Sequence, residues 1–137
     1  MSEYRARLLT RMELPLANKF YRQHQPQMRA HGDEQVWLLK ERETVGAVRL
    51  KPVENGHWLT GLFIHPEHRG KGLARELLQT VLLHHGGPVW LFCEPGLNAL
   101  YERVGFAPAA SLPAALAQRL EGYRRHQTLV ALAYEAS

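Results

Sequence analysis

The clearest pattern in the sequence is an alternation of apolar and polar residues in the middle of the chain. Across residues 43–53 this alternation is regular from Val48 to Lys51, as expected when every second side chain of a strand faces a core. Asn55-Gly56 follows, a dipeptide typical of two-residue hairpin turns. The apolar run after this turn predicts a second strand over residues 57–65, antiparallel to the first.

A second pattern repeats every three to four residues and predicts amphipathic helices. Proline suits the first turn of a helix and glycine ends one, and these residues flank several of the periodic segments. The predicted helices cover residues 15–25, Leu73 to the stop at Gly86-Gly87-Pro88, Leu97 to Gly105, and the segment from its capping residue Ser111 to Tyr123.

Shorter apolar runs complete the set of predicted elements. Residues 4–10, 36–40, 89–93 and 127–134 are predicted as strands. Because Val89 to Cys93 is apolar throughout, this strand is expected to be buried on both faces. Strands and helices are interleaved along the chain, with three strands in succession after the first helix. This order predicts an α/β fold with a mixed sheet and helices on both faces.

Length and composition are those of a globular protein with one domain. The 137 residues contain no internal repeat or linker, so residues 1–137 are expected to form a single domain. Apolar residues make up 45% of the chain, yet no run approaches the roughly 20 residues that span a bilayer. The first nine residues lack the apolar core of a signal peptide. A single cysteine, Cys93, fits a reducing cytoplasm, where we expect the protein to be located.

The net charge of +4 has two interpretations. A basic surface often binds polyanions such as nucleic acid, and a basic patch suits a phosphorylated cofactor equally well. The Lys and Arg residues are scattered, and the chain has neither an aromatic-glycine RNA-binding signature nor a Cys/His zinc spacing. We therefore expect no nucleic-acid partner and no bound metal.

One segment combines several features of a phosphate-binding turn. Residues 65–75 form a basic, glycine-rich turn and the start of a helix, where exposed N–H groups and the helix dipole favour an anion. Gly70 and Gly72 allow a positive φ and the close approach of a phosphate, and Ala74 is small. The P-loop and dinucleotide fingerprints are absent, since no Gly-Lys-Ser/Thr occurs and position 75 is Arg75. The alternative is a plain strand-to-helix turn.

Three stretches in this half of the chain resemble the GNAT superfamily of N-acetyltransferases. Arg69 to Ala74 is similar to the family's R/Q-x-x-G-x-G/A loop, and Leu62-x-Ile64-x-Pro66 is similar to the end of its fourth strand. Downstream, Leu100 to Phe106 resembles its L-Y-x-x-x-G-F helix ending. The resemblance covers most of the chain, with only a loose match over residues 107–137.

The resemblance implies a GNAT-like fold whose mostly antiparallel sheet splays apart between the fourth and fifth strands, 57–65 and 89–93. The pantetheine arm of acetyl-coenzyme A (acetyl-CoA) is expected to enter this gap along the fourth strand. Gly61 within that strand indicates either a bulge that forces the two strands apart or a residue that only relieves crowding. The implied cofactor-binding residues are Leu62, Phe63, Ile64, Arg69, Gly70, Lys71, Gly72, Leu73, Ala74, Arg75 and Asn98.

At one position the sequence departs from the family. The family often has an asparagine seven residues before the tyrosine of the downstream helix, where it contacts the cofactor. Here that residue is Glu94, and Asn98 is the expected substitute.

The resemblance also implies catalytic roles. Tyr101 matches the tyrosine that protonates the departing thiolate, the alternative being a core tyrosine on an apolar helix face. Backbone N–H groups of Phe63 or Ile64 would polarise the thioester carbonyl. The family often uses a carboxylate on the fourth strand to accept the amine proton, but residues 57–64 contain none. The candidates for this base are His57, which we place first, Glu54, His65, Glu94 and a water relay.

The predicted function is transfer of an acetyl group from acetyl-CoA to an amine carried by a small molecule, a peptide or a protein. Two alternatives belong to other classes of protein. One is a non-catalytic acetyl-CoA sensor that regulates a partner protein, and the other is a nucleic-acid-binding protein. The sequence leaves open the identity of the acceptor and the oligomeric state, for which a homodimer is the option considered.

Overall fold

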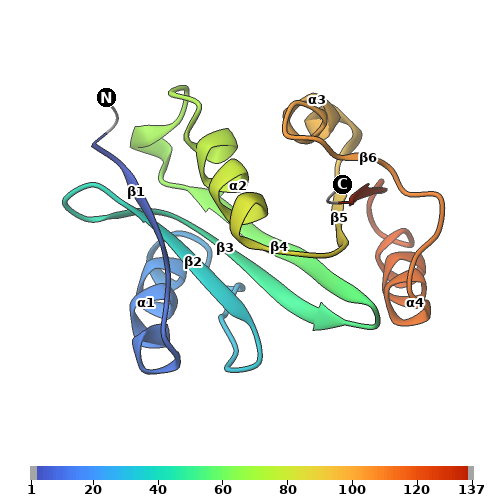
Figure 1. Ribbon diagram of the computed structural model, residues 1–137, viewed down its shortest axis with the longest axis horizontal. Helices are drawn as coiled ribbons and strands as arrows, with labels where there is room; N and C mark the ends of the chain where they lie inside the picture. Colours follow the sequence, from blue (N-terminus) through green and yellow to red (C-terminus); the bar gives the residue numbers. More distant parts are fainter. Residues whose placement is uncertain (1–2, 136–137) are drawn as a thin grey trace.

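The computed structural model describes residues 3–135, which form a twisted sheet with helices on both of its faces (Figure 1). Seven strands lie in the order β1-β2-β3-β4-β5-β7-β6, and each neighbouring pair is antiparallel except β4 and β5. The strands are β1 (Arg5–Leu8), β2 (Gln35–Lys40), β3 (Thr44–Val53), β4 (Gly56–Ile64), β5 (Val89–Cys93), β6 (Ala107–Pro108) and β7 (Val130–Tyr134). The α-helices are α1 (Leu14–His24), α2 (Leu73–His84), α3 (Asn98–Glu102) and α4 (Ala114–Tyr123).

This element order confirms the predicted mixed α/β fold, with differences near the C-terminal end. Strand β6 was not predicted, because two residues are too few to show a period. The predicted helix cap at Ser111 is wrong, since α4 begins at Ala114 with Pro113 in the N-cap position. Proline disfavours the helical conformation in the residue that precedes it, so the helix begins after Pro113.

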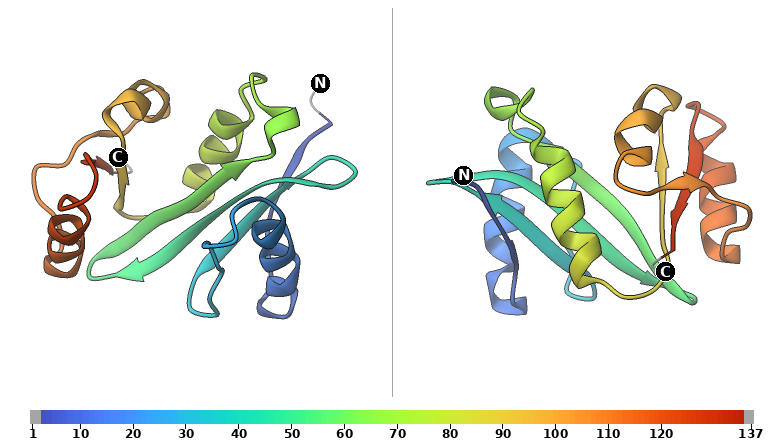
Figure 2. Two further views of the ribbon diagram at one scale, coloured as in Figure 1. Left: turned by 180° about the vertical axis from the view of Figure 1, so that it is seen from behind. Right: turned by 45° about the horizontal axis from the view of Figure 1, so that its top comes forward.

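The helices divide between the two faces of the sheet, as the two views in Figure 2 show. Helices α2 and α3 cover one face, where Leu77, Leu78 and Tyr101 belong to the larger core. Helix α1 covers the other face through a second core that includes Phe20. Helix α4 lies on this second face beside β5 and leaves Phe92 only half-buried. The expectation that β5 is buried on both faces is therefore wrong for one face.

Strands β4 and β5 are paired at one end only. Their pairing is limited to His57 with Val89 and Trp58 with Trp90, after which the strands diverge (Figure 1). Opposite this point β4 contains an extra residue relative to β3. Ala47 pairs with Phe63 and Arg49 pairs with Thr60, so one residue of β3 faces two of β4, which defines a bulge. The predicted bulge and the predicted splay are both present.

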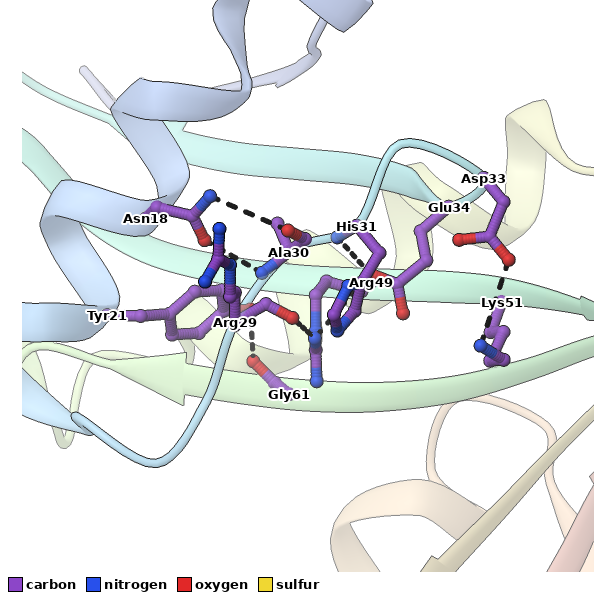
Figure 3. Close-up of polar contacts among 10 residues, drawn as sticks. All are labelled: Asn18, Tyr21, Arg29, Ala30, His31, Asp33, Glu34, Arg49, Lys51 and Gly61. Atoms are coloured by element: carbon purple, nitrogen blue, oxygen red, sulfur yellow. Dashed lines mark hydrogen bonds and ion pairs between the residues drawn. The ribbon is translucent and has the colours of Figure 1, made fainter.

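A buried polar cluster holds this bulge (Figure 3). The Tyr21 hydroxyl donates a hydrogen bond of 2.7 Å to the carbonyl oxygen of Gly61, and burial raises the pKa of Tyr21 well above its usual range. The Arg49 guanidinium lies beside them, 5.5 Å from the centre of the Tyr21 ring. Arg49 also donates to the Arg29 carbonyl and forms an ion pair of 3.5 Å with the buried carboxylate of Glu34. A loop carbonyl and the Glu34 carboxylate thus neutralise and partly hydrogen-bond the buried charge beneath the bulge, while Arg49 Nε has no hydrogen-bond partner within residues 3–135.

Replacing Gly61 with Ala should destabilise the fold. Gly61 has a φ of +68°, and an added Cβ would lie 2.6 Å from Arg49 Nε and 2.9 Å from the Tyr21 hydroxyl oxygen. The backbone strain alone is worth about 1–3 kcal/mol, and the overlap adds to it. Urea unfolding of Gly61→Ala measures the loss. Gly96→Ala is the matched control, because a Cβ there meets no atom within 4 Å; equal stability of the two variants would contradict this account of the bulge.

Candidate functional site

A cavity of about 500 Å³ opens where β4 and β5 diverge. One wall is the end of β4, from Leu62 to Ile64, and the second is the turn that leads into α2. The third wall comes from the segment around α3, including Leu100 and Tyr101. Three elements that are distant in sequence therefore meet at this cavity.

The turn before α2 has the geometry of an anion cradle. Gly72 occupies the N-cap position with a φ of +75°, and a Cβ at this position would meet no atom within 4 Å. The first hydrogen bond of the helix runs from the Glu76 N–H to the Gly72 carbonyl at 3.1 Å. The N–H groups of Leu73, Ala74 and Arg75 consequently have no partner within the helix. Open space beside these donors suits an anion such as a phosphate.

Three arginines add positive charge to this cavity in different ways. The Arg69 side chain turns back, since its Nε donates to the Ile64 carbonyl at 2.9 Å and its guanidinium lies 4.9 Å from the centre of the Phe63 ring. Arg69 therefore ties the turn to the end of β4. Arg75 from α2 and Arg103, which follows α3, both line the cavity, and neither has an ion-pair partner among residues 3–135.

The edge of β4 is open along the cavity. Beyond Trp58 this edge has no strand partner, because β5 has already diverged. Backbone donors and acceptors at an open strand edge bind an extended ligand as an added strand would. Leu97 and Leu100 supply the apolar surface on the facing wall. The cavity thus combines an anion cradle with a groove for an extended, partly apolar chain.

Tyr101 brings a hydroxyl group to this cavity. Its side chain is 7% exposed and lines the cavity, and its ring packs against Phe106 with centroids 5.9 Å apart. Burial, with a smaller contribution from Cys93, raises the pKa of Tyr101 to about 12. Within residues 3–135 its hydroxyl has no hydrogen-bond partner. A neutral phenol that can donate a hydrogen bond therefore faces the cavity.

Comparison with protein families identifies this arrangement. Residues 32–108 match the acetyltransferase (GNAT) domain, a match that spans more than half of the chain. The chain belongs to the GNAT acetyltransferase family. A comparison with curated protein sequences gives no match.

Solved structures share the fold at low sequence identity. ElaA of Escherichia coli is 19% identical with a TM-score of 0.68, over 96% of this chain and 99% of its own. The ribosomal-protein-S18-alanine N-acetyltransferase of E. coli is 16% identical with a TM-score of 0.69, over 98% and 96%. N-acetylglutamate synthase of Neisseria gonorrhoeae, complexed with coenzyme A and N-acetyl-glutamate, is 14% identical with a TM-score of 0.70. That match covers 98% of this chain and 35% of the synthase.

Most of the residues expected to bind the GNAT cofactor lie together around the cavity. Two of them do not line it. Lys71 points to Tyr4, with Nζ 3.4 Å from its hydroxyl oxygen, and Asn98 accepts a weak hydrogen bond from the Cys93 thiol at 3.5 Å. The expected residues on the cavity wall are Leu62, Phe63, Ile64, Arg69, Gly70, Gly72, Leu73, Ala74 and Arg75, together with the expected acid Tyr101.

His57 lies at the closed end of β4, away from the cavity. It pairs with Val89, and its backbone N–H donates to the Pro88 carbonyl at 3.0 Å. Burial, and secondarily the neighbouring His85, lowers the pKa of His57; the two rings are 4.3 Å apart. The other candidate bases, Glu54, His65 and Glu94, are also absent from the cavity wall.

Four residues of the cavity wall were not predicted from the sequence: His68, Leu97, Leu100 and Arg103. The two leucines could have been recognised from the sequence, because they lie on the same apolar helix face as Tyr101. That face borders the gap between β4 and β5. His68 and Arg103 are polar residues near the ends of short elements, and no period distinguishes them from surface residues. Elsewhere in residues 3–135, no three His, Cys, Asp or Glu side chains are arranged to hold a metal ion. No helix in that range is both long and apolar enough to cross a membrane.

Replacing Gly72 with Val should remove coenzyme A binding from a folded protein. The branched side chain would enter the space beside the free N–H groups, where charge-assisted hydrogen bonds to a phosphate form. Loss of two such bonds lowers the affinity roughly 100-fold or more. Titration calorimetry measures the affinity for coenzyme A.

Gly87→Val is the matched control. Gly87 also has a positive φ, +97°, and open space where a Cβ would lie, but it follows the other end of α2. Unchanged affinity in folded Gly72→Val would rule out the cradle.

Proposed function

We propose that this GNAT protein is an N-acetyltransferase that moves an acetyl group from acetyl-CoA directly to an amine. The observation that carries the proposal is the single cavity at the β4–β5 splay, which joins an anion cradle, an open strand edge and a neutral phenol. Each feature meets a different part of acetyl-CoA. The cradle suits its pyrophosphate, the strand edge suits its pantetheine amides, and the phenol suits its sulfur.

The cofactor is proposed to bind along the β4 edge. Its pyrophosphate would receive hydrogen bonds from the N–H groups at the start of α2, with Arg75 and Arg103 of the lining supplying charge. Leu62 to Ile64 would hold the pantetheine arm against the strand edge. Arg69 has a positioning role, because it fixes the end of β4 relative to the turn.

Acetyl transfer requires a free amine, a polarised thioester and a proton for the leaving sulfur. The amine nitrogen attacks the thioester carbon, the carbon–nitrogen bond forms, and the carbon–sulfur bond breaks. Backbone N–H groups of Phe63 or Ile64 would stabilise the negative oxygen. Tyr101 would donate its proton to the thiolate and recover one from solvent.

The amine proton needs an acceptor, since alkylammonium groups titrate near 10. We assign this role to water that leads from the cavity to solvent, because His57 lies at the closed end of β4 and Glu54, His65 and Glu94 do not line the cavity. The acceptor would be an amine of a small molecule, a peptide or a protein. One domain over residues 1–137 would suffice for this chemistry, without nucleic acid or a membrane.

One observation favours a second candidate, a non-catalytic acetyl-CoA sensor. Among the described residues, no Asp or Glu lines the cavity, so a strong base near the thioester is missing. Both candidates bind acetyl-CoA, and only the enzyme releases coenzyme A faster when an amine is added. Free-thiol release measured across a panel of amines, amino acids and peptides separates the two; binding without release by any member would favour the sensor.

Tyr101→Phe should lower turnover by roughly 10²–10⁴-fold, the usual contribution of a positioned acid. The ring and its packing remain, so coenzyme A affinity and stability should change little. Because the pKa of Tyr101 is about 12, its phenol stays protonated from pH 6 to pH 10. Deprotonation of Tyr101 should therefore not lower wild-type turnover in that range. Free-thiol release over this pH range measures both effects.

Tyr134→Phe is the matched control for this substitution. Tyr134 also packs against Phe106, with ring centroids 5.6 Å apart, but does not line the cavity. Turnover of this control should stay within about threefold of wild type. Equal turnover of both variants would mean that Tyr101 is a core residue and that the thiolate leaves without its help.

A further inference from the structure

A second cavity, of about 440 Å³, lies on the α1 face of the sheet. It is bordered by α1, by the ends of β2 and β3, and by the residue that follows β4. Its polar lining includes Lys19 and His24 from α1, Lys40 and Thr44 from the β2–β3 hairpin, and His65. Nothing in acetyl transfer as proposed above uses these side chains.

Positive charge exceeds negative charge around this cavity. Neither Lys19 nor Lys40 has an ion-pair partner among residues 3–135. Glu43 is the one acidic residue in the lining. The same lining contains two lysine ammonium groups and two histidine imidazoles. Like charges that share a concave surface repel one another, and a bound anion relieves that repulsion.

The two histidines are placed to act together. The rings of His24 and His65 have centroids 4.5 Å apart. Burial lowers the pKa of His24, and the positive groups of His65 and Arg69 lower it further. His65 Nδ1 accepts a hydrogen bond of 3.0 Å from the Glu67 N–H, so Nε2 carries the hydrogen of neutral His65. An anion would therefore find an N–H donor here in addition to the two lysines.

The second cavity shares a wall with the acetyl-CoA cavity. Phe63 is one of the residues that line the acetyl-CoA cavity, and its ring packs on the α1 face, where His24 stacks on it with centroids 5.7 Å apart and an interplanar angle of 25°. Arg69 lies 4.9 Å from the same ring and ties the turn of the cradle to β4. A ligand that moves His24 would therefore act on a residue of the strand segment that lines the acetyl-CoA cavity.

We propose that this second cavity binds a small molecule that carries a phosphate monoester. Lysine ammonium groups are compact point charges that suit a phosphate dianion, and the Gln23 amide and Thr44 hydroxyl add neutral donors. Leu16 and Phe20 form an apolar part of the lining, which suits the organic portion of such a ligand. The site is distinct from the cradle at α2, and its ligand is linked to acetyl-CoA through Phe63.

Inorganic phosphate is the probe that tests this site. Histidine ring signals are followed by NMR during phosphate titration, once with free protein and once with protein saturated with coenzyme A. Coenzyme A occupies the cradle at α2 in the second arm, so phosphate binding there cannot mimic the effect. His24 and His65 should shift in a saturable manner in both arms, and the pKa of His24 should rise when phosphate is bound.

Charge-removing variants separate this site from a general effect of ionic strength. Lys19→Gln and Lys40→Gln should each weaken phosphate binding roughly tenfold. Lys51→Gln removes the same charge from a lysine paired with Asp33 at 3.7 Å and should leave binding unchanged. Shifts that do not saturate, or equal shifts in all three variants, would overturn the proposal. Loss of the shifts on addition of coenzyme A would overturn it too, since the cavity would then belong to the acetyl-CoA site.

Discussion

The hydrogen bond from the Tyr21 hydroxyl to the Gly61 carbonyl, with the Arg49 guanidinium beside it, holds β4 in its bulged form. A buried donor or acceptor that loses its partner destabilises a fold by about 1–3 kcal/mol, so each member of this cluster depends on the others. The bulge increases the local twist of β4. As a result β4 and β5 pair only at His57 and Trp58 and then diverge. The cavity exists because the sheet does not close at this point.

The chemistry of the cavity follows from which groups the open sheet leaves unpaired. An edge of β4 has no strand partner, and the first turn of α2 has N–H groups without partners in the helix. The strand edge presents backbone donors and acceptors and the helix start presents donors, so one extended ligand with an anionic end would satisfy both. Arg75 and Arg103 also line the cavity and would complement the charge of that ligand. Part of the net charge of +4 is therefore placed around this cavity, as a basic patch for a phosphorylated cofactor requires.

Features with a local cause could be predicted from the sequence. The cradle at residues 69–75 depends on glycines, cations and a helix start that are adjacent in the chain, and the bulge at Gly61 depends on one residue within a strand. Roles that depend on distant contacts could not be predicted. His57 seemed suited to be a base until the pairing of β4 with β5 placed it at the closed end. Arg103 and the cavity beside His24 and Lys40 likewise become visible only when separate elements meet.

The central claim is that the open edge of β4 and the start of α2 receive one ligand, acetyl-CoA. Amide hydrogen exchange followed by NMR, with and without coenzyme A, tests this claim most directly. Exchange should slow on binding for N–H groups within Leu62–Ile64 and within Leu73–Arg75, because the ligand supplies partners that the fold leaves open. The His57 N–H, already bonded to the Pro88 carbonyl at 3.0 Å, should not change. Protection of neither segment, or of the α2 turn alone, would contradict the account.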